Sequence, residues 1–388
     1  MKTGLELAFS NDNIDKFSGS RVGLIVNPAS VDSSFQHAAD IFAARGEFEL
    51  TALFGPQHGI RGETQDNMIE WTGFTDPRTG VPAFSLYGET REPTAGMLRD
   101  VDVLVFDVQD VGTRVYTFIW TMALAMRVCA REGKRFVVLD RPNPIGGDLV
   151  EGNVLDPGFS SFVGLYPIPM RHGMTVGELA LLLNAEHGIN CELDVVKMEG
   201  WRRGMQFEET GLPWVMPSPN MPTADTARVY PGGVIFEGTN ISEGRGTTRP
   251  FELAGAPWVD SHALAARMNS LELPGVKFRE AWFQPTFHKW AGERCGGVQL
   301  HVKDADVFPA YFAGLCLLAA IRDQSIENFA WKQPPYEYEF ERLPIDLICG
   351  TDTVRLGIER GDNLFEMRAH FQPELDAFIE KRRKYLLY

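Results

Sequence analysis

Residues 21–29, RVGLIVNPA, decide the fold class, because they form a short apolar run that stops at a proline-containing loop. Residues 35–44 then carry apolar side chains at helical spacing. Further apolar runs follow at 48–54, 101–108 and 135–139, with a helical segment at 116–131. Short apolar strands that alternate with helices are typical of a parallel sheet with both faces covered. The sequence therefore predicts an α/β fold built on a parallel sheet.

The second half of the chain has a different pattern. A helix is predicted at 175–187, where Thr175 is the N-cap and Glu178 completes a capping box. After the proline-rich residues 213–222, shorter strands at 275–282 and 297–302 alternate polar with apolar side chains, and helices are predicted at 261–271, 307–323 and 374–385. We place a boundary near Tyr230. The expected organisation is an α/β domain over residues 1–230 and a smaller α+β domain over 231–388.

The composition excludes several classes of protein. The 388 residues are 44% hydrophobic and carry a net charge of −15, which is the composition of a folded globular protein. This charge argues against a nucleic-acid partner, since counterion release from phosphates needs a basic face. Arginines nevertheless recur in glycine- and proline-rich loops, a placement that favours a small anionic ligand. These arginines are Arg61, Arg114, Arg141, Arg171, Arg245 and Arg249.

Cysteine usage and hydropathy narrow the class further. The five cysteines are scattered without a C-x-x-C pair, so we expect buried free thiols rather than a metal site or a disulfide scaffold. Residues 1–22 lack the apolar core of a signal peptide. The chain also lacks an apolar run of the roughly 18 residues that a membrane span needs. We therefore expect a cytoplasmic protein without a membrane partner.

Polar, glycine-rich loops follow three predicted strands, at residues 55–62, 109–116 and 140–147. Ligands of parallel α/β sheets bind outside the carboxyl ends of the strands, so these loops are expected to form a site. His58 is either a general acid/base, a donor to the substrate, or a histidine tied to a neighbouring carbonyl group. Asp110, deep in its loop, is a candidate, whereas Asp140 and Arg141 are equally consistent with a local salt bridge.

Two later segments add candidates. Arg171 and His172 closely precede the helix predicted at 175–187, whose N-terminus favours an anion. Residues 236–250, FEGTNISEGRGTTRP, place carboxylates, arginines and an amide on a glycine-rich backbone that can approach a ligand closely. The alternative for this segment is a turn-rich linker with solvated charges. Its polar candidates are Glu237, Asn240, Glu243 and Arg245.

Common cofactor motifs are missing from the sequence. No Gly-x-Gly-x-x-Gly follows the first strand and no Gly-Lys-Ser/Thr loop occurs, so a nucleotide cofactor is not expected. There is no His-Glu-x-x-His or other clustered metal-ligand spacing, so no metal is expected either. Residues 214–222, WVMPSPNMP, set a tryptophan beside prolines and Asn220, which suits a sugar platform or, equally, a core corner. Tyr116 is another candidate platform.

Seven motifs occur in order along the chain: residues 54–62, 107–116 (DVQDVGTRVY), 140–147 (DRPNPIGG), 170–179 (MRHGMTVGEL), 217–222 (PSPNMP), 237–252 (EGTNISEGRGTTRPFE) and 255–258 (GAPW). Together they resemble the exo-acting β-N-acetylmuramidases of the NamZ type, from about residue 21 to the C-terminus. The resemblance implies a Rossmann-like catalytic domain, a smaller C-terminal domain and an active site in the cleft between them. It also implies hydrolysis of terminal, non-reducing N-acetylmuramic acid from peptidoglycan fragments, without a metal or nucleotide.

The candidate residues fit such a small muropeptide or amino-sugar substrate. The lactyl carboxylate of N-acetylmuramic acid suits an arginine, and its acetamido group suits Asn220 or Asn240. The catalytic candidates are Glu243, Glu237, His58, Glu63 and Asp110. The substrate-binding candidates are Gln57, Arg61, Arg114, Tyr116, Asp140, Arg141, Asn143, Arg171, His172, Asn220, Asn240 and Arg245.

Gln57 departs from the pattern of the family, whose commoner motif is Gly-Pro-Glu-His-Gly. An amide neither donates a proton as an acid nor attacks as a carboxylate. We expect Glu63, Glu70, Glu237 or Glu243 to supply the catalytic carboxyl group instead. The mechanism is retaining, inverting or assisted by the acetamido group, and in the last case Gln57 would orient the substrate. The alternatives are a non-catalytic muropeptide-binding protein and a glycosidase of altered sugar specificity.

Overall fold

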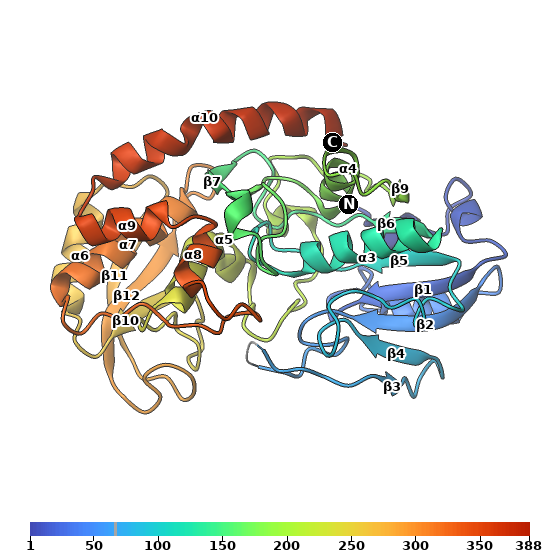
Figure 1. Cartoon of the computed structure of the whole chain (residues 1–388), viewed down its shortest axis with the longest axis horizontal. Helices are drawn as coiled ribbons and strands as arrows, with labels where there is room; N and C mark the ends of the chain where they lie inside the picture. Colours follow the sequence, from blue (N-terminus) through green and yellow to red (C-terminus); the bar gives the residue numbers. More distant parts are fainter. Residues whose placement is uncertain (66–67) are drawn as a thin grey trace.

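The computed structural model describes residues 1–65 and 68–388. Its main feature is a seven-stranded sheet with the strand order β3-β4-β2-β1-β5-β6-β9 (Figure 1). Neighbouring strands are parallel except for the pair of β3 and β4. The strand order reverses direction beside β1, which makes the sheet doubly wound. The sequence had predicted a parallel sheet with both faces covered. The strands are β1 (Arg21–Val26), β2 (Glu49–Gly55), β3 (Phe74–Thr75), β4 (Pro82–Ser85), β5 (Val103–Asp107), β6 (Arg135–Leu139) and β9 (Glu192–Val196).

The strands of this sheet carry apolar side chains on both faces. Helices therefore cover both faces, and each face forms a separate core with its helices. Val103 and Val105 pack into a core with α1 (Gly4–Leu7) and α2 (Ala38–Ala43). Leu104 and Phe106 point the other way, into a larger core with α3 (Phe118–Glu132) and α4 (Val176–Glu186). Thr175 caps α4, and the predicted capping box with Glu178 is present.

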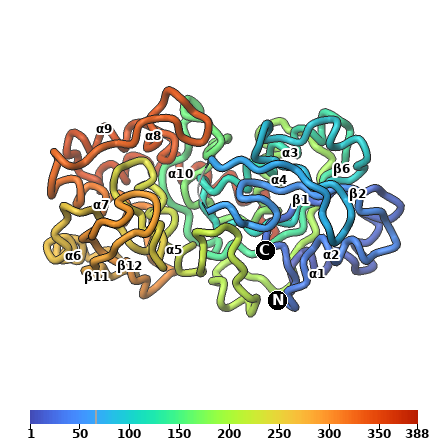
Figure 2. The backbone as a smooth tube through the Cα atoms, turned by 90° about the horizontal axis from the view of Figure 1, so that it is seen from below, coloured from blue at the N-terminus to red at the C-terminus, as the bar shows by residue number. Residues whose placement is uncertain are grey.

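The smaller part is built on a three-stranded antiparallel sheet of order β10-β12-β11, as expected for an α+β unit. The larger of the two cores continues into this part without a break. Figure 2 shows the two parts side by side along the long axis, with residues of the middle of the chain between them. The elements of the smaller part are β10 (Leu253–Ala256), α6 (Ser261–Ser270), β11 (Val276–Phe283), β12 (Cys295–Val302), α7 (Ala310–Gln324), α8 (Pro344–Cys349), α9 (Thr353–Arg360) and α10 (Leu364–Arg382).

The remaining elements connect the two parts. A short antiparallel pair joins β7 to β8, and α5 leads into a 3-10 turn. The expected boundary near Tyr230 lies inside α5. These elements are β7 (Glu151–Val154), β8 (Pro169–Arg171), α5 (Ala224–Gly233) and the 3-10 turns η1 (Ile14–Lys16), η2 (Pro157–Phe159), η3 (Phe207–Thr210), η4 (Val234–Gly238) and η5 (Arg383–Tyr385).

The last helix differs from the prediction. A helix was expected only from residue 374, since Pro373 interrupts the helical pattern, but α10 begins at Leu364 and continues through that proline. Proline lacks an N–H and disfavours a helix interior, yet tertiary packing outweighs this preference here. Met367 and Phe378 are buried on either side of Pro373 and anchor the helix to the larger core.

Helix α10 returns the chain to the sheet part. It runs along one edge of the molecule, and the C-terminus lies near the N-terminus (Figure 1). Arg382 donates to the Gly147 carbonyl at 2.9 Å. The Tyr388 hydroxyl donates to the Asp140 carboxylate at 2.8 Å and accepts the Met198 N–H at 2.7 Å. The end of the chain is thus fastened to the carboxyl edge of the large sheet.

Replacing Tyr388 by phenylalanine is expected to lower the free energy of unfolding by about 1–2 kcal/mol, because a hydrogen bond to a buried carboxylate is lost. Tyr385→Phe is the matched control, since the Tyr385 hydroxyl donates to the exposed Glu186. We expect a loss below about 0.5 kcal/mol for this control. Urea unfolding of both variants measures the difference, and equal losses would argue against a structural role of the Tyr388 hydroxyl.

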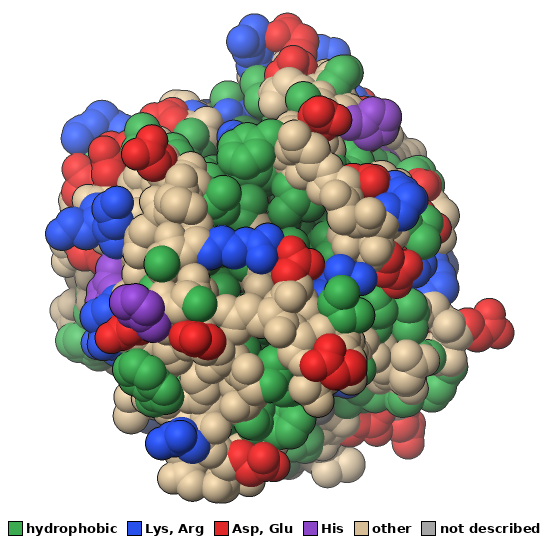
Figure 3. Space-filling model, turned by 90° about the vertical axis from the view of Figure 1, so that its left-hand side faces the viewer, with side chains coloured by type: hydrophobic (Ala, Val, Ile, Leu, Met, Phe, Trp, Pro, Cys, Tyr) green, Lys and Arg blue, Asp and Glu red, His purple; other side chains and the backbone are tan. Residues whose placement is uncertain are grey.

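The outer face of the smaller part mixes charges of both signs. In Figure 3, Lys and Arg side chains alternate with Asp and Glu side chains around a hollow lined by hydrophobic groups. This face is not the continuous basic surface that a nucleic-acid backbone requires. Among the described residues, no helix is long and apolar enough to cross a membrane.

Candidate active site

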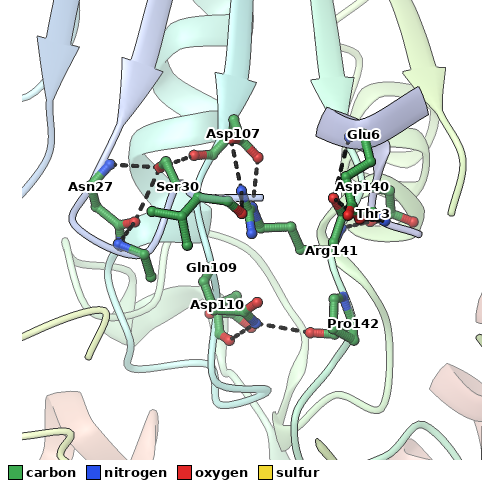
Figure 4. A network of polar contacts seen from close by, with 12 residues as sticks. Thr3, Glu6, Asn27, Ser30, Asp107, Gln109, Asp110, Asp140, Arg141 and Pro142 are labelled. Carbon is green, nitrogen blue, oxygen red and sulfur yellow. Dashed lines mark hydrogen bonds and ion pairs between the residues drawn. The ribbon is translucent and has the colours of Figure 1, made fainter. Parts of the chain in front are cut away.

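A buried ion pair lies where the strand order of the large sheet reverses, between β1 and β5 (Figure 4). Arg141 donates to both oxygens of Asp107, from Nε at 2.6 Å and from Nη2 at 2.8 Å. Ser30 donates to the Asp107 carbonyl oxygen and to the Asn27 side chain. Because ligands of this fold usually occupy the switch point, the internal pair takes up part of the space that a ligand would use there.

The loops around this ion pair are occupied by internal contacts. Asp110 accepts the Gly112 N–H at 2.7 Å, and its other near neighbour is His172, whose Nε2 lies 3.3 Å from the carboxylate. Asn143 donates to the Met174 carbonyl and accepts the Ile145 N–H. These residues shape the loops at the carboxyl edge of the sheet.

A polar pocket lies farther along, between the sheet part and the smaller part. It is lined from both parts of the chain. The lining residues with polar side chains are Gln57, His58, Tyr116, Thr117, Ser218, Asn220, Tyr230, Glu237, Arg245, Tyr336 and Glu337.

Glu337 is held in this pocket by two donors from the sheet part. Gln57 Nε2 donates to Glu337 Oε1 at 3.1 Å, and the Tyr87 hydroxyl donates to Glu337 Oε2 at 2.6 Å. The Thr117 hydroxyl donates to Gln57 Oε1 at 2.7 Å. The Thr117 contact fixes the amide with its NH₂ group toward Glu337, so the orientation of Gln57 follows from its partners.

A tight hairpin of the smaller part places Glu337 at the boundary with the sheet part. Tyr336 and Glu339 form an isolated antiparallel bridge, and Glu337 and Tyr338 have positive φ angles of 46° and 66°. Such backbone conformations are unfavourable for residues other than glycine and are kept only where surrounding contacts enforce them. Arg91 of the sheet part supplies one such contact, with its guanidinium 3.7 Å from the centre of the Tyr338 ring.

Burial raises the pKa of Glu337 to about 7. The hydrogen bond from Tyr87 lowers this pKa, the charge of Glu237 raises it, and Gln57 and Arg91 lower it. Since burial disfavours the charged form of a carboxylate, Glu337 is protonated in a substantial fraction of molecules at neutral pH.

Glu237 is the second buried carboxylate of the pocket. Arg245 Nη2 lies 2.7 Å from Glu237 Oε1, and the Tyr336 hydroxyl donates to Glu237 Oε2 at 2.7 Å. The adjacent residues Tyr336 and Glu337 therefore reach two different carboxylate centres of the same pocket. A cation and a phenol thus fix the position of Glu237.

Glu243 lies behind the pocket wall and not among the lining residues. Lys289 Nζ lies 2.8 Å from its carboxylate, His288 Nδ1 lies 3.2 Å away and Arg245 Nη1 lies 3.3 Å away. Burial by itself would raise the pKa of Glu243, but Lys289, His288 and Arg245 outweigh it and hold this pKa well below its usual value. We propose that Glu243 positions Arg245 rather than donating a proton.

The structure brings some of the candidate residues together and separates others. Of the seventeen candidates, those that line the pocket are Gln57, His58, Tyr116, Asn220, Glu237 and Arg245. The ring of His58 also contacts the Thr64 carbonyl through Nδ1 at 2.8 Å, one of the alternatives that the sequence left open. The candidates outside the lining are Arg61, Glu63, Asp110, Arg114, Asp140, Arg141, Asn143, Arg171, His172, Asn240 and Glu243.

Several of the outlying candidates have evident structural contacts. Arg114 is fully buried and donates to four carbonyl groups, of Asn153, Ile168, Ile348 and Cys349, which ties the two parts together. Arg171 donates to the carbonyl groups of Ile145 and Phe308. Asn240 donates to the Asn328 carbonyl and accepts the Ala330 N–H. The Asp140 carboxylate accepts hydrogen bonds from Thr175 and Gly177. Arg61 and Glu63 lie on the surface or close to it. This geometry gives these residues no contact with the pocket.

Sequence reasoning missed Glu337, its donor Tyr87, and Thr117, which donates to Gln57. The run Pro334-Pro335-Tyr336-Glu337-Tyr338-Glu339 carries the one local signal, a repeated pair of an aromatic and an acidic residue after two prolines. Among residues 1–65 and 68–388, no group of three or more His, Cys, Asp or Glu side chains has the arrangement that a metal ion needs.

The fold and the site define a class of protein: a two-part α/β enzyme with buried carboxylates in the pocket between its parts. Two family models match the chain, those of the N-terminal part of exo-β-N-acetylmuramidase NamZ over residues 22–225 and of its C-terminal part over 228–388. The chain belongs to the NamZ family of exo-β-N-acetylmuramidases, which are glycoside hydrolases.

Individual relatives agree with this assignment. The peptidoglycan β-N-acetylmuramidase NamZ of Bacillus subtilis (strain 168) is 48% identical over 388 residues, covering 100% of this chain and 91% of that protein. Two crystal structures of DUF1343 family proteins from Bacteroides fragilis NCTC 9343 are also similar, with TM-scores of 0.90 and 0.77 and identities of 38% and 30%. Each comparison covers 100% of this chain and 98% of the other.

Proposed function

We propose that this chain is an exo-β-N-acetylmuramidase that releases terminal, non-reducing N-acetylmuramic acid from peptidoglycan fragments. The observation that carries the proposal is the pair of buried glutamates, Glu237 and Glu337, that line one pocket between the two parts in a member of this family. Glycoside hydrolysis usually needs two carboxyl groups on opposite sides of the scissile bond.

The polar lining also suits the substituents of this sugar. Arg245 is a cation that lines the pocket, and a carboxylate such as the lactyl group is its natural partner. Asn220 and Ser218 line the same pocket and suit an acetamido group, and Tyr116 and Phe118 also line it. Asn240, the other amide considered for this role, lies outside the lining.

The alternative of a non-catalytic muropeptide-binding protein was motivated by Gln57. Glu337 now supplies a carboxyl group 3.1 Å from the Gln57 amide. The replacement of the family's glutamate by glutamine therefore leaves an acid at the same point of the pocket, which supports a hydrolytic function.

The lactyl group provides a test of the substrate. We expect an aryl β-muramide to be hydrolysed about 10–100-fold faster than the matching N-acetylglucosaminide, because hydrogen bonds to a charged group contribute about 1.5–3 kcal/mol. The measurement is kcat/KM for both substrates, with N-acetylmuramic acid release from a disaccharide that carries this sugar at its non-reducing end as the positive control. Equal rates on the two sugars would contradict recognition of the lactyl carboxylate.

A further inference from the structure

We propose that Glu337 is the general acid of this enzyme, and that Gln57 and Tyr87 are the residues that position its carboxyl group. The inference rests on the proposed hydrolysis of muramides and adds to it the identity of the proton donor. None of the acids suggested by the local motifs occupies this place in the pocket.

The first support is the geometry of the Glu337 carboxyl group. Each of its oxygens accepts a hydrogen bond from a side chain on the sheet part, Oε1 from Gln57 and Oε2 from Tyr87. Two fixed contacts determine the plane of the group, and a carboxyl oxygen has further capacity beyond one accepted bond. Since Glu337 lines the pocket, a proton on the remaining position can point to a bound sugar.

The second support is the neutrality of the partner at position 57. A glutamate there would place two carboxyl groups at hydrogen-bond distance, and such a pair shares one proton between its members. Gln57 is instead a neutral donor whose carbonyl oxygen is occupied by Thr117. The acidic proton therefore resides on Glu337 rather than being divided between two side chains.

The third support is that the two buried glutamates of residues 236–250, Glu237 and Glu243, are held as acceptors. Arg245 and Tyr336 contact the two oxygens of Glu237. Lys289, Arg245 and the ring of His288 contact Glu243, which lies outside the pocket lining. Glu337 has no such ion pair within 4 Å among the described contacts, and burial keeps its pKa near neutral, where a general acid is most effective.

The proposed step is the protonation of the glycosidic oxygen. Glu337 gives its proton to this oxygen while the bond from C1 breaks and its electron pair moves to the oxygen, so the aglycone leaves as an alcohol. A water molecule then forms the new bond to C1 and releases one proton. This proton goes to Glu237 or back to Glu337, according to the face from which the water arrives. The sum is glycoside plus water giving two hydroxyl compounds.

The groups around Glu337 set its pH dependence. The phenols among them have pKa values raised above the usual range and stay neutral near pH 7. As a general acid works in its protonated form, kcat/KM is expected to fall as pH rises through about 7. The titratable and charged groups that act on the carboxyl group are Tyr87, Arg91, Tyr230, Glu237, Tyr336 and Tyr338, and His58 lines the same pocket.

The decisive experiment compares leaving groups in a Glu337→Gln variant. We expect its kcat/KM to fall about 100-fold or more on a disaccharide with a sugar leaving group, which needs protonation. The loss is expected to be far smaller on a dinitrophenyl muramide, whose leaving group departs without a proton. The variant also loses the fall in kcat/KM above pH 7. Glu341→Gln, four residues later on the exposed part of the same loop, is the matched control and keeps wild-type rates on both substrates.

Positioning by Gln57 and Tyr87 is tested through the pH profile. Gln57→Glu adds a negative charge beside Glu337 and Tyr87→Phe removes a donor to its carboxylate, so both are expected to move the fall in kcat/KM to higher pH. Equal losses on both leaving groups for Glu337→Gln, or an unchanged pH profile in all three variants, would overturn the inference. Failure of the wild-type protein to release N-acetylmuramic acid from any muramide would instead overturn the proposed function, and the inference with it.

Discussion

Asp107→Asn is expected to lower the free energy of unfolding by about 3–5 kcal/mol, because it leaves the Arg141 guanidinium charged and buried without its counter-ion. The Arg141 side chain is 4% exposed and the Asp107 side chain 0%, and two hydrogen bonds of 2.6 and 2.8 Å join them. An amide can accept one of these bonds but cannot neutralise the charge. Urea unfolding followed by circular dichroism measures the loss.

The same strand provides a matched control. Asp102, at the other end of β5, also contacts an arginine through both oxygens, but the Asp102 and Arg21 side chains are 42% and 41% exposed. Asp102→Asn is therefore expected to cost about 0.2–1 kcal/mol, as is usual for solvent-exposed pairs. A double replacement, Asp107→Leu with Arg141→Met, should recover much of the stability, since no unpaired charge remains. Similar losses from Asp107→Asn and Asp102→Asn would contradict the view that burial makes the Asp107–Arg141 pair sensitive.

Arg245→Met is the second large effect, and it acts on stability and activity together. The Arg245 side chain lies between Glu237 Oε1 at 2.7 Å and Glu243 Oε1 at 3.3 Å. Burial by itself lowers the pKa of Arg245, but the two glutamates outweigh it and raise the pKa above the usual range. Without this cation the pocket keeps its buried carboxyl groups and gains no counter-charge. We expect unfolding to become easier by about 3–5 kcal/mol.

The effect on hydrolysis follows from the same charges. A substrate with a lactyl carboxylate brings a further negative group into the pocket, so kcat/KM on a muramide is expected to fall about 10²–10³-fold. Arg249→Met is the control on the same loop, since the Arg249 side chain is 47% exposed and makes longer contacts with Glu252 at 3.3–3.4 Å. If Arg245→Met had the same stability and the same kcat/KM as Arg249→Met, Arg245 would be needed neither for stability nor for binding the lactyl carboxylate.

Much of the fold could be predicted because one sequence pattern recurs through the first half of the chain. Each parallel strand is a short apolar run, and the expected strand at residues 135–139 has the bounds observed for β6. The prediction failed where tertiary contacts override a local preference. Pro373 and Pro231 lie inside helices, and short strands such as β10 lack any run long enough to stand out. Local patterns do not contain the packing that tolerates these residues.

The pocket could be predicted in part for a similar reason. Gln57, Glu237 and Arg245 belong to dense glycine-rich segments, so their composition alone marks them as candidates. Glu337 belongs to a short loop of alternating tyrosines and glutamates that resembles ordinary solvated charge. Its hydrogen-bond partners Gln57 and Tyr87 come from the sheet part, and its pKa is raised by burial and by the charge of Glu237. A property created by distant neighbours leaves no mark on the local sequence.

The hydrogen bond between Gln57 and Glu337 joins positions that are 280 residues apart. Because the two side chains contact each other, a change of charge at either position is expected to change the pKa of a carboxyl group at the other, so substitutions at the two positions are expected to be coupled. Recombination that paired this C-terminal half with an N-terminal half carrying glutamate at position 57 would bring two carboxyl groups together. The number of protons bound in the pocket would then change. The two halves are therefore expected to be inherited as one unit, with the active site as the reason.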